Sequence, residues 1–220
     1  MEYLQGMLYR FMNDYASELH EARKSQNFKR PLGSLVRQDI AKYIQSRANS
    51  DIYFVKGSVG TGRWTDVPWI AVFDKRITKS AREGVYIVYL LNKDTKTLYL
   101  TLNQGAAKKN TKQLKDKAWE IQQKIVAPDS ISTETIDCGS KAYNAGCIFH
   151  KEYHLDNVPD DNILLDDLNK FISLYDNYYQ VFIAKEKAVG HVVDEEEDKR
   201  MIDQTTKDSI ERIKSYIYDC

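Results

Sequence analysis

Two stretches of the 220-residue chain decide its fold: GVYIVYLL at 84–91 and TLYLTL at 97–102, joined by polar residues 92–96. Their aromatic and β-branched content predicts two strands, and the short polar connection is typical of a hairpin. Upstream, WIAVF at 69–73 is a brief apolar run that predicts a buried strand. The three runs together predict an antiparallel meander at the centre of the fold.

Helical and strand patterns surround this meander. Apolar residues at three- and four-residue spacing predict helices, and short β-branched runs predict strands. The predicted helices span 2–24, 34–47, 106–126, 164–185 and 201–218, and the further strands span 51–56, 131–137 and 146–153. The predicted fold class is therefore α+β: an antiparallel or mixed β-sheet flanked by helices, with a C-terminal helical extension.

The chain carries 32 basic and 32 acidic residues, so its formal net charge is zero. The charge is nevertheless divided: residues 1–151 hold 24 Lys and Arg against 15 Asp and Glu, and residues 152–220 hold 8 against 17. Such opposite excesses indicate a basic working surface beside an acidic tail or linker, with chance clustering as the alternative. The acidic run at 193–199 predicts a domain at 1–185 followed by an acidic connector and helix at 186–220.

The sequence has no feature of a membrane or secreted protein. No apolar run reaches the roughly 18 residues of a membrane span. The first residues lack a basic region followed by an apolar run, so they do not form a secretory signal. Three cysteines in 220 residues fit a reducing compartment better than a disulfide scaffold. We therefore expect a cytoplasmic protein without membrane contact.

A glycine-rich stretch, GSVGTG at 57–62, raises the question of nucleotide binding. No G-K-[ST] follows it, its spacing is not G-x-G-x-x-G, and no helical pattern comes next. The residues therefore do not predict a phosphate-binding P-loop. A flexible connection explains them, as does a loop whose backbone must approach a ligand closely, which glycine permits.

A zinc site is the next possibility, because Cys138, Cys147, His150 and His154 lie close together in the sequence. Their spacing does not match the C-x2–4-C start of common zinc modules. In a strand, Cys147 and His150 would also point to opposite faces. We therefore expect neither a metal nor another cofactor.

Catalytic signatures are also weak. Neither G-x-S-x-G nor H-E-x-x-H occurs in the sequence. A metal-dependent nuclease would need carboxylates that hold a metal ion, and Asp66 and Asp74 are the nearest candidates. A small nuclease using these two residues remains an alternative, and surface charges at strand ends are the simpler explanation.

Cations and aromatic residues alternate along the central region. Cations in loops can contact phosphates, and aromatic faces can stack on exposed bases. Tyr86, Val88 and Leu90 share one strand face, and Ile87, Tyr89 and Leu91 share the other. One set must face the core, and the other could line a concave site with Trp69. The competing interpretation is a protein-interaction module in which all these aromatics are ordinary core. The cations expected to contact nucleic acid are Arg63, Lys79, Arg82, Lys108 and Lys109.

Three motifs point to a known family. GTGRWTDVPWIAVF at 60–73, SAREGVYIVYLL at 80–91 and LYLTLNQG at 98–105 together resemble the amino-terminal DNA-recognition domain of the McrB family. That family belongs to modification-dependent restriction systems. The resemblance implies a domain that binds DNA and flips a methylated cytosine into an aromatic pocket.

The resemblance also implies roles for individual residues. Trp69 would stack on the flipped base, and Tyr86 and Leu90 would form the wall facing its 5-methyl group. Tyr143 and Ile136 are both candidates for a later pocket residue, of which Tyr143 is favoured. The loop residues that would lie against DNA, with their neighbours, are Gly60, Thr61, Gly62, Arg63 and Trp64. In the family's best-known member an aromatic stands at the position of Thr61.

The family's partners extend beyond this chain. They are a GTPase motor and a nuclease subunit, and no Walker motif occurs in the 220 residues. We therefore expect a non-catalytic domain of a modification-dependent restriction endonuclease or anti-phage defence protein. Its expected partners are double-stranded DNA carrying 5-methyl- or 5-hydroxymethylcytosine and a GTPase or nuclease effector module, with residues 186–220 leading towards that module.

Overall fold

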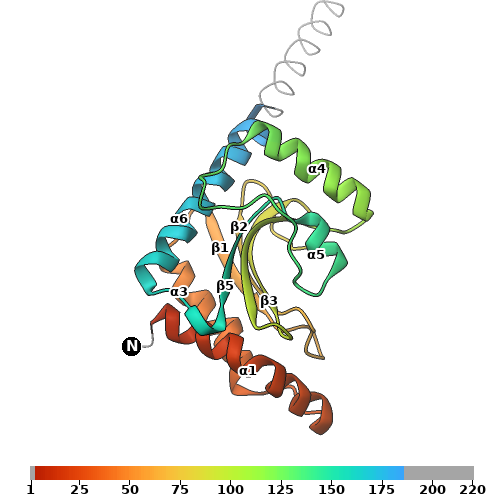
Figure 1. The fold of residues 1–220 in the computed structure, drawn as a ribbon, viewed down its shortest axis with the longest axis vertical. Helices are drawn as coiled ribbons and strands as arrows, with labels where there is room; N and C mark the ends of the chain where they lie inside the picture. Colours follow the sequence, from red (N-terminus) through yellow and green to blue (C-terminus); the bar gives the residue numbers. More distant parts are fainter. Residues whose placement is uncertain (1–2, 186–220) are drawn as a thin grey trace, which may run out of the picture. The chain divides into compact units, whose positions relative to one another are not determined.

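A five-stranded antiparallel sheet forms the centre of the fold (Figure 1). Its strand order follows the chain, so each strand pairs with the next. The strands are β1 (Tyr53–Ser58), β2 (Trp69–Asp74), β3 (Val85–Asn92), β4 (Thr97–Gln104) and β5 (Phe149–His154). The predicted meander and the α+β class are confirmed, and the sheet is antiparallel rather than mixed.

The computed structural model describes residues 3–185, so the predicted connector at 186–220 and its helix lie outside the described residues. One compact unit extends to Tyr178, and the π-helical η3 (Tyr179–Ala184) belongs to a second unit. The first unit contains α1 (Leu4–Ser25), α2 (Pro31–Ser34), π-helical η1 (Leu35–Ile40), α3 (Ala41–Gln45), α4 (Thr111–Lys124), α5 (Lys141–Gly146), the short η2 (Leu155–Asn157) and α6 (Asp161–Tyr178). None of the described helices has the length and apolar content needed to span a membrane.

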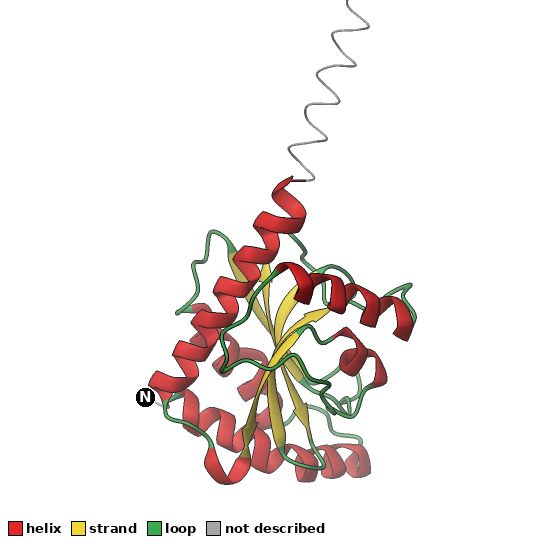
Figure 2. Cartoon of the chain, turned by 45° about the horizontal axis from the view of Figure 1, so that its top comes forward, coloured by secondary structure: helices red, strands yellow, loops and turns green. Residues whose placement is uncertain are grey.

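The two faces of the sheet are covered by different segments (Figure 2). Tyr89 of β3 lies opposite Leu100 of β4, and both belong to the face against α6. On this face, Tyr153 of β5 donates a hydrogen bond to Asp167 of α6. We call this the helix face. Alternate residues, including Val88 opposite Thr101, form the second face. Every residue of β3 and β4 is buried, so both faces are covered along the central strands.

Helix α1 is capped by a carboxylate from the far end of the sequence. Its own first turn has no acidic residue and no side-chain cap. Instead, Asp161 at the start of α6 accepts hydrogen bonds from the backbone N–H groups of Leu4 (3.1 Å) and Gln5 (2.8 Å) and from the Tyr43 hydroxyl (2.8 Å). A negative charge at a helix amino terminus is favourable, so Asp161 joins α1, α3 and α6.

The π-helical segment η1 lies directly against strand β1. A Cβ atom added at Gly57 would stand 2.0 Å from the Val36 carbonyl oxygen and 3.0 Å from the Arg37 Cα atom. Only glycine permits this approach, because any side chain would collide with backbone. The predicted strand at 51–56 therefore extends through Gly57, and the predicted loop begins later.

Other boundaries differ from the sequence prediction for local reasons. Helix α4 begins at Thr111 rather than at 106, because the Asn110 side chain forms a capping box with Gln113. Residues 131–137 form no strand; Ser132 makes a single bridge to His150. Helix α5 was not predicted, since six residues are too few to give a helical pattern.

We predict that Asp161→Asn destabilises the domain by about 1–2 kcal/mol at neutral pH, because a charged acceptor of three hydrogen bonds is lost. Burial opposes ionisation of Asp161, but the hydrogen bonds from Gln5, Tyr43 and Leu4 outweigh it and lower the pKa of the carboxyl. A lowered folded-state pKa gives stability that is present above the unfolded value and is lost as pH falls through the folded one.

Urea unfolding at several pH values measures this effect. The difference between wild type and Asp161→Asn should shrink below about pH 4, where the unfolded carboxyl becomes protonated. Asp156→Asn, at an exposed position of η2, is the matched control and should change stability by less than about 0.5 kcal/mol. A constant difference from neutral pH down to pH 2 would contradict the assignment.

Candidate nucleic-acid interface

Trp69 and Leu90 are neighbours on the second face. They lie opposite each other in the register of β2 and β3. Leu90 is fully buried, whereas Trp69 is partly exposed. The partly exposed Trp69 therefore lies beside the buried, apolar Leu90. Both residues are at the end of the sheet where β2 begins and β3 ends. We call this the loop end of the sheet.

Tyr86 lies on the same face but further along β3. Four residues separate it from Leu90, which corresponds to about 13 Å along a strand. The Tyr86 ring packs against Phe73, with 5.3 Å between ring centroids, and its hydroxyl donates to the Ala81 carbonyl oxygen at 2.9 Å. Burial and the nearby Tyr143 hydroxyl raise the pKa of Tyr86. Trp69 therefore lies beside Leu90, and Tyr86 lies near Tyr143. These two pairs occupy different positions along the second face.

Residues 136–144 lie against the second face, and we call them the covering segment. The Asn92 side chain donates to the Asp137 carbonyl oxygen at 2.8 Å, and the Asn103 side chain donates to the Tyr143 carbonyl oxygen at 3.1 Å. Both asparagines belong to the second face. Within the segment, Asn144 accepts the Cys138 backbone N–H at 3.0 Å. Side-chain hydrogen bonds, rather than strand pairing, hold this cover in place.

The predicted pocket residues in the covering segment differ in exposure. Ile136 is 4% exposed and Tyr143 is partly exposed, so Tyr143 is the one closer to solvent. Burial raises the pKa of the Cys138 thiol to about 11, which keeps it protonated near neutral pH. Residues 3–185 contain no group of three or more His, Cys, Asp or Glu residues that could hold a metal ion.

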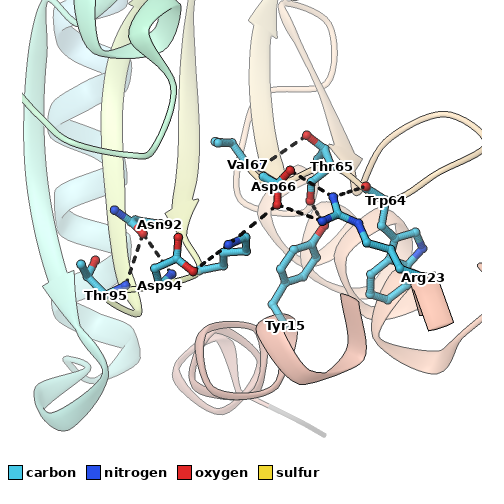
Figure 3. Close-up of polar contacts among 10 residues, drawn as sticks. Tyr15, Arg23, Trp64, Thr65, Asp66, Val67, Asn92, Asp94 and Thr95 are labelled. Carbon is cyan, nitrogen blue, oxygen red and sulfur yellow. Dashed lines mark hydrogen bonds and ion pairs between the residues drawn. The ribbon is translucent and has the colours of Figure 1, made fainter. Parts of the chain in front are cut away.

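The glycine-rich loop is clamped at its base (Figure 3). The Tyr15 hydroxyl of α1 donates to the Thr65 carbonyl oxygen at 2.8 Å, and the Thr65 N–H donates to the Val59 carbonyl oxygen at 2.8 Å. Arg23 donates to both oxygens of Asp66, at 3.2 and 3.0 Å. The tip, residues 61–63, is exposed. The loop is therefore fixed at its base and open at its tip.

Trp64 belongs to the clamp and not to the exposed tip. Its side chain is only 3% exposed and stacks on Tyr15, with 5.4 Å between ring centroids. Its indole N–H donates to the Phe28 carbonyl oxygen at 3.1 Å. The Trp64 ring is therefore buried and holds the loop, and DNA contact by this residue stays a prediction.

Asp66 also links this loop to the β3–β4 turn. Its carboxylate lies 3.7 Å from the Lys93 ammonium, and Asn92 accepts the backbone N–H groups of Asp94 and Thr95 at 3.0 and 3.3 Å (Figure 3). Because Asn92 also holds the covering segment, the loop, the turn and the cover meet at the loop end.

Asp74 lies at the other end of β2, fully buried, with Arg76 as its ion-pair partner. Asp66 and Asp74 therefore do not converge on one metal position.

The predicted DNA contacts form two groups. Residues 60–63 lie at the loop end of the sheet. The second group lies at the opposite end, in the connection between β2 and β3 and in the connection after β4, and its exposed members are Lys79, Arg82, Lys108 and Lys109. A 2.9 Å hydrogen bond from Ala107 N–H to the Arg82 carbonyl oxygen joins these two connections. Six residues of β2 separate the two ends by about 20 Å. The structure thus brings each group together but not the two groups.

Sequence reasoning missed Tyr99, which is paired with Leu90 on the second face and is 7% exposed. Burial raises the pKa of Tyr99, although a hydrogen bond from the Asp137 backbone opposes that shift. The alternation in TLYLTLNQ separates Tyr99 from its leucine neighbours. Only the register of the hairpin, however, places it beside Leu90.

Comparison with known proteins shows the family to which the chain belongs. A search of curated proteins finds no match to the chain. A family model described as MrcB-like, N-terminal domain matches residues 11–180, which include the whole sheet, the glycine-rich loop and the covering segment. The chain therefore belongs to the MrcB-like N-terminal domain family, which has a DNA-binding recognition role in restriction systems.

Proposed function

We propose that this domain binds double-stranded DNA carrying 5-methyl- or 5-hydroxymethylcytosine and receives the flipped base on the second face of its sheet. One observation carries the proposal: the partly exposed Trp69 stands directly beside the buried Leu90. An aromatic face can stack on a base, and an apolar neighbour suits its 5-methyl group. Tyr86 and Tyr143 form the far wall in this proposal.

The energetics of base flipping limit how well such a pocket discriminates. Extruding a base costs a few kcal/mol. Stacking on one aromatic ring returns about 1–3 kcal/mol. Burying one methyl group adds only about 0.8 kcal/mol. Strong preference for a modified cytosine therefore requires polar contacts to the edge of the base as well as an apolar wall.

Entry of a base requires the covering segment to move. Leu90 and Tyr86 are both fully buried in the unbound domain. The hydrogen bonds that join the segment to the sheet come from the Asn92 and Asn103 side chains. A hydrogen bond of this kind contributes only about 0.5–1.5 kcal/mol net, so opening is compatible with the binding energy of a flipped base.

The loop tip and the basic connections supply contacts to the DNA backbone in this proposal. The exposed tip consists of Thr61, Gly62 and Arg63, with Gly60 at its start. The second group, at the opposite end of the sheet, consists of Lys79, Arg82, Lys108 and Lys109. Two cationic groups about 20 Å apart suit successive positions along one duplex.

We further propose that the domain itself is not catalytic and acts in the cytoplasm for a GTPase or nuclease effector module in anti-phage defence. The separation of Asp66 from Asp74 along β2 argues against a metal-dependent nuclease at those residues. Mg²⁺-dependent cleavage of DNA by the purified chain would reverse this view. The second rival, a protein-interaction module, would bind plain and modified duplexes equally weakly.

Trp69→Ala should weaken binding to a 5-methylcytosine duplex by about 5- to 150-fold, which corresponds to the 1–3 kcal/mol of one stacking contact. Trp69→Phe should retain much of the affinity, because it keeps an aromatic face. Fluorescence anisotropy at one stated salt concentration measures both variants against plain, 5-methyl and 5-hydroxymethyl duplexes.

Trp119→Ala is the matched control, because Trp119 is 65% exposed on α4 and lies outside the proposed pocket. Its affinity for DNA should equal that of the wild type. Circular dichroism verifies that each variant is folded. Equal wild-type affinity for plain and modified duplexes would refute modification reading, and loss of fold in Trp69→Ala would support a purely structural role for that ring.

A further inference from the structure

A polar cavity of about 420 Å³ lies beside the glycine-rich loop. It is bounded by the segment after α1, by η1 and by the loop itself. The residues that define its chemistry are Lys29, Arg37, Gly60, Gly62 and Trp64. No acidic side chain is among its lining residues. The cavity therefore combines two cations with glycine backbone, which suits an anion.

The ion pairs around this cavity distinguish its cations from their neighbours. Arg23 is paired with Asp66 at 3.0 Å, and Arg30 is paired with Glu18. For Arg37 and Lys29, by contrast, the described part of the chain supplies no carboxylate within salt-bridge distance. Two exposed cations in one cavity repel each other. An anionic ligand would relieve that repulsion.

The Arg37 side chain lies close to Gly33 and Trp64. A Cβ atom added at Gly33 would stand 2.6 Å from the Arg37 Nη2 atom and 3.0 Å from the Trp64 Cζ2 atom. The guanidinium group therefore lies directly over Gly33 and beside the buried indole of Trp64. The preceding contact of η1 with Gly57 fixes the backbone of Arg37.

The opposite wall of the cavity is backbone. Gly60 and Gly62 have φ angles of +105° and +75°, which favour glycine. A Cβ atom at Gly60 would stand 2.2 Å from the Arg63 carbonyl oxygen, whereas one at Gly62 would have no heavy atom within 4 Å. Gly62 therefore leaves open space on the cavity side of the loop, where the backbone can approach a ligand closely.

We propose that this cavity binds a phosphodiester group of the DNA backbone, with Arg37 as the bidentate donor and Lys29 as a second cation. Arginine matches phosphate oxygens through two parallel N–H donors. Trp64, which lines the cavity, and Trp69 are separated by only five residue steps, so their Cα atoms lie at most about 18 Å apart. The inference rests on the proposed function and adds the strand contact beside the flipped nucleotide.

Salt-dependent binding tests this assignment. Arg37→Ala should weaken binding to plain and 5-methylcytosine duplexes by the same factor, because a phosphate contact carries no sequence information. The slope of log affinity against log salt should become shallower by about 0.9, the value for one phosphate contact. Arg37→Lys should keep the slope but lose part of the affinity, because an ammonium group cannot bind two oxygens in parallel.

Two further variants make the test specific. Gly33→Ala keeps the charge of Arg37 but displaces its guanidinium, so it should reduce affinity for both duplexes. Lys42→Ala removes an exposed cation from α3, outside the cavity, and should leave the slope unchanged. Thermal unfolding monitored by circular dichroism confirms that each variant is folded before its affinity is compared.

The possible outcomes separate this inference from the proposed function. If the wild type prefers the methylated duplex but folded Arg37→Ala binds with unchanged affinity and slope, the phosphate assignment is wrong and the proposed function stands. If the wild type binds no duplex, both fail. Calorimetry with inorganic phosphate is the last arm: tight binding lost in Arg37→Ala, without any change in DNA affinity, would identify a small-anion site instead.

Discussion

The burial of both faces of β3 and β4 is the constraint on which the rest of the domain depends. An antiparallel sheet commonly leaves one face in water, with polar residues alternating along each strand. Here every position of the two central strands is buried, including Thr101 and Asn103 on the second face. The helix face is covered by packed helices, whereas the covering segment on the second face consists of irregular chain and the first part of the short α5.

Contacts between distant parts of the sequence hold the rigid side together. Asp161 caps a helix that begins more than 150 residues earlier, and Tyr53 donates to Asp176 at 2.8 Å from the first strand. These contacts leave α1 and α6 as a stable support for the sheet. On the second face, the side chains of Asn92 and Asn103 join the covering segment to the sheet.

The sequence predicted the strands well because their signal is local: alternating aromatic and β-branched residues, with a polar turn between them. Boundaries set by single side chains were not predictable in this way, as the Asn110 cap shows. The π-helical form of η1 and the position of Arg37 over Gly33 depend on tertiary contacts that no pattern reveals. The separation of the two basic groups was inferable in principle, because successive connections of a meander alternate between the two ends of the sheet.

The hydrogen bonds of Asn92 have a consequence for the timing of recognition. The same side chain holds the covering segment and organises the turn that Lys93 ties to the glycine-rich loop. When the cover must open before a base enters, association is limited by the fraction of time it spends open. When it closes again, the trapped base can leave only as fast as the cover reopens. Under the proposed base-flipping function, we therefore expect the residence time on DNA, more than the encounter rate, to distinguish a modified site from plain ones.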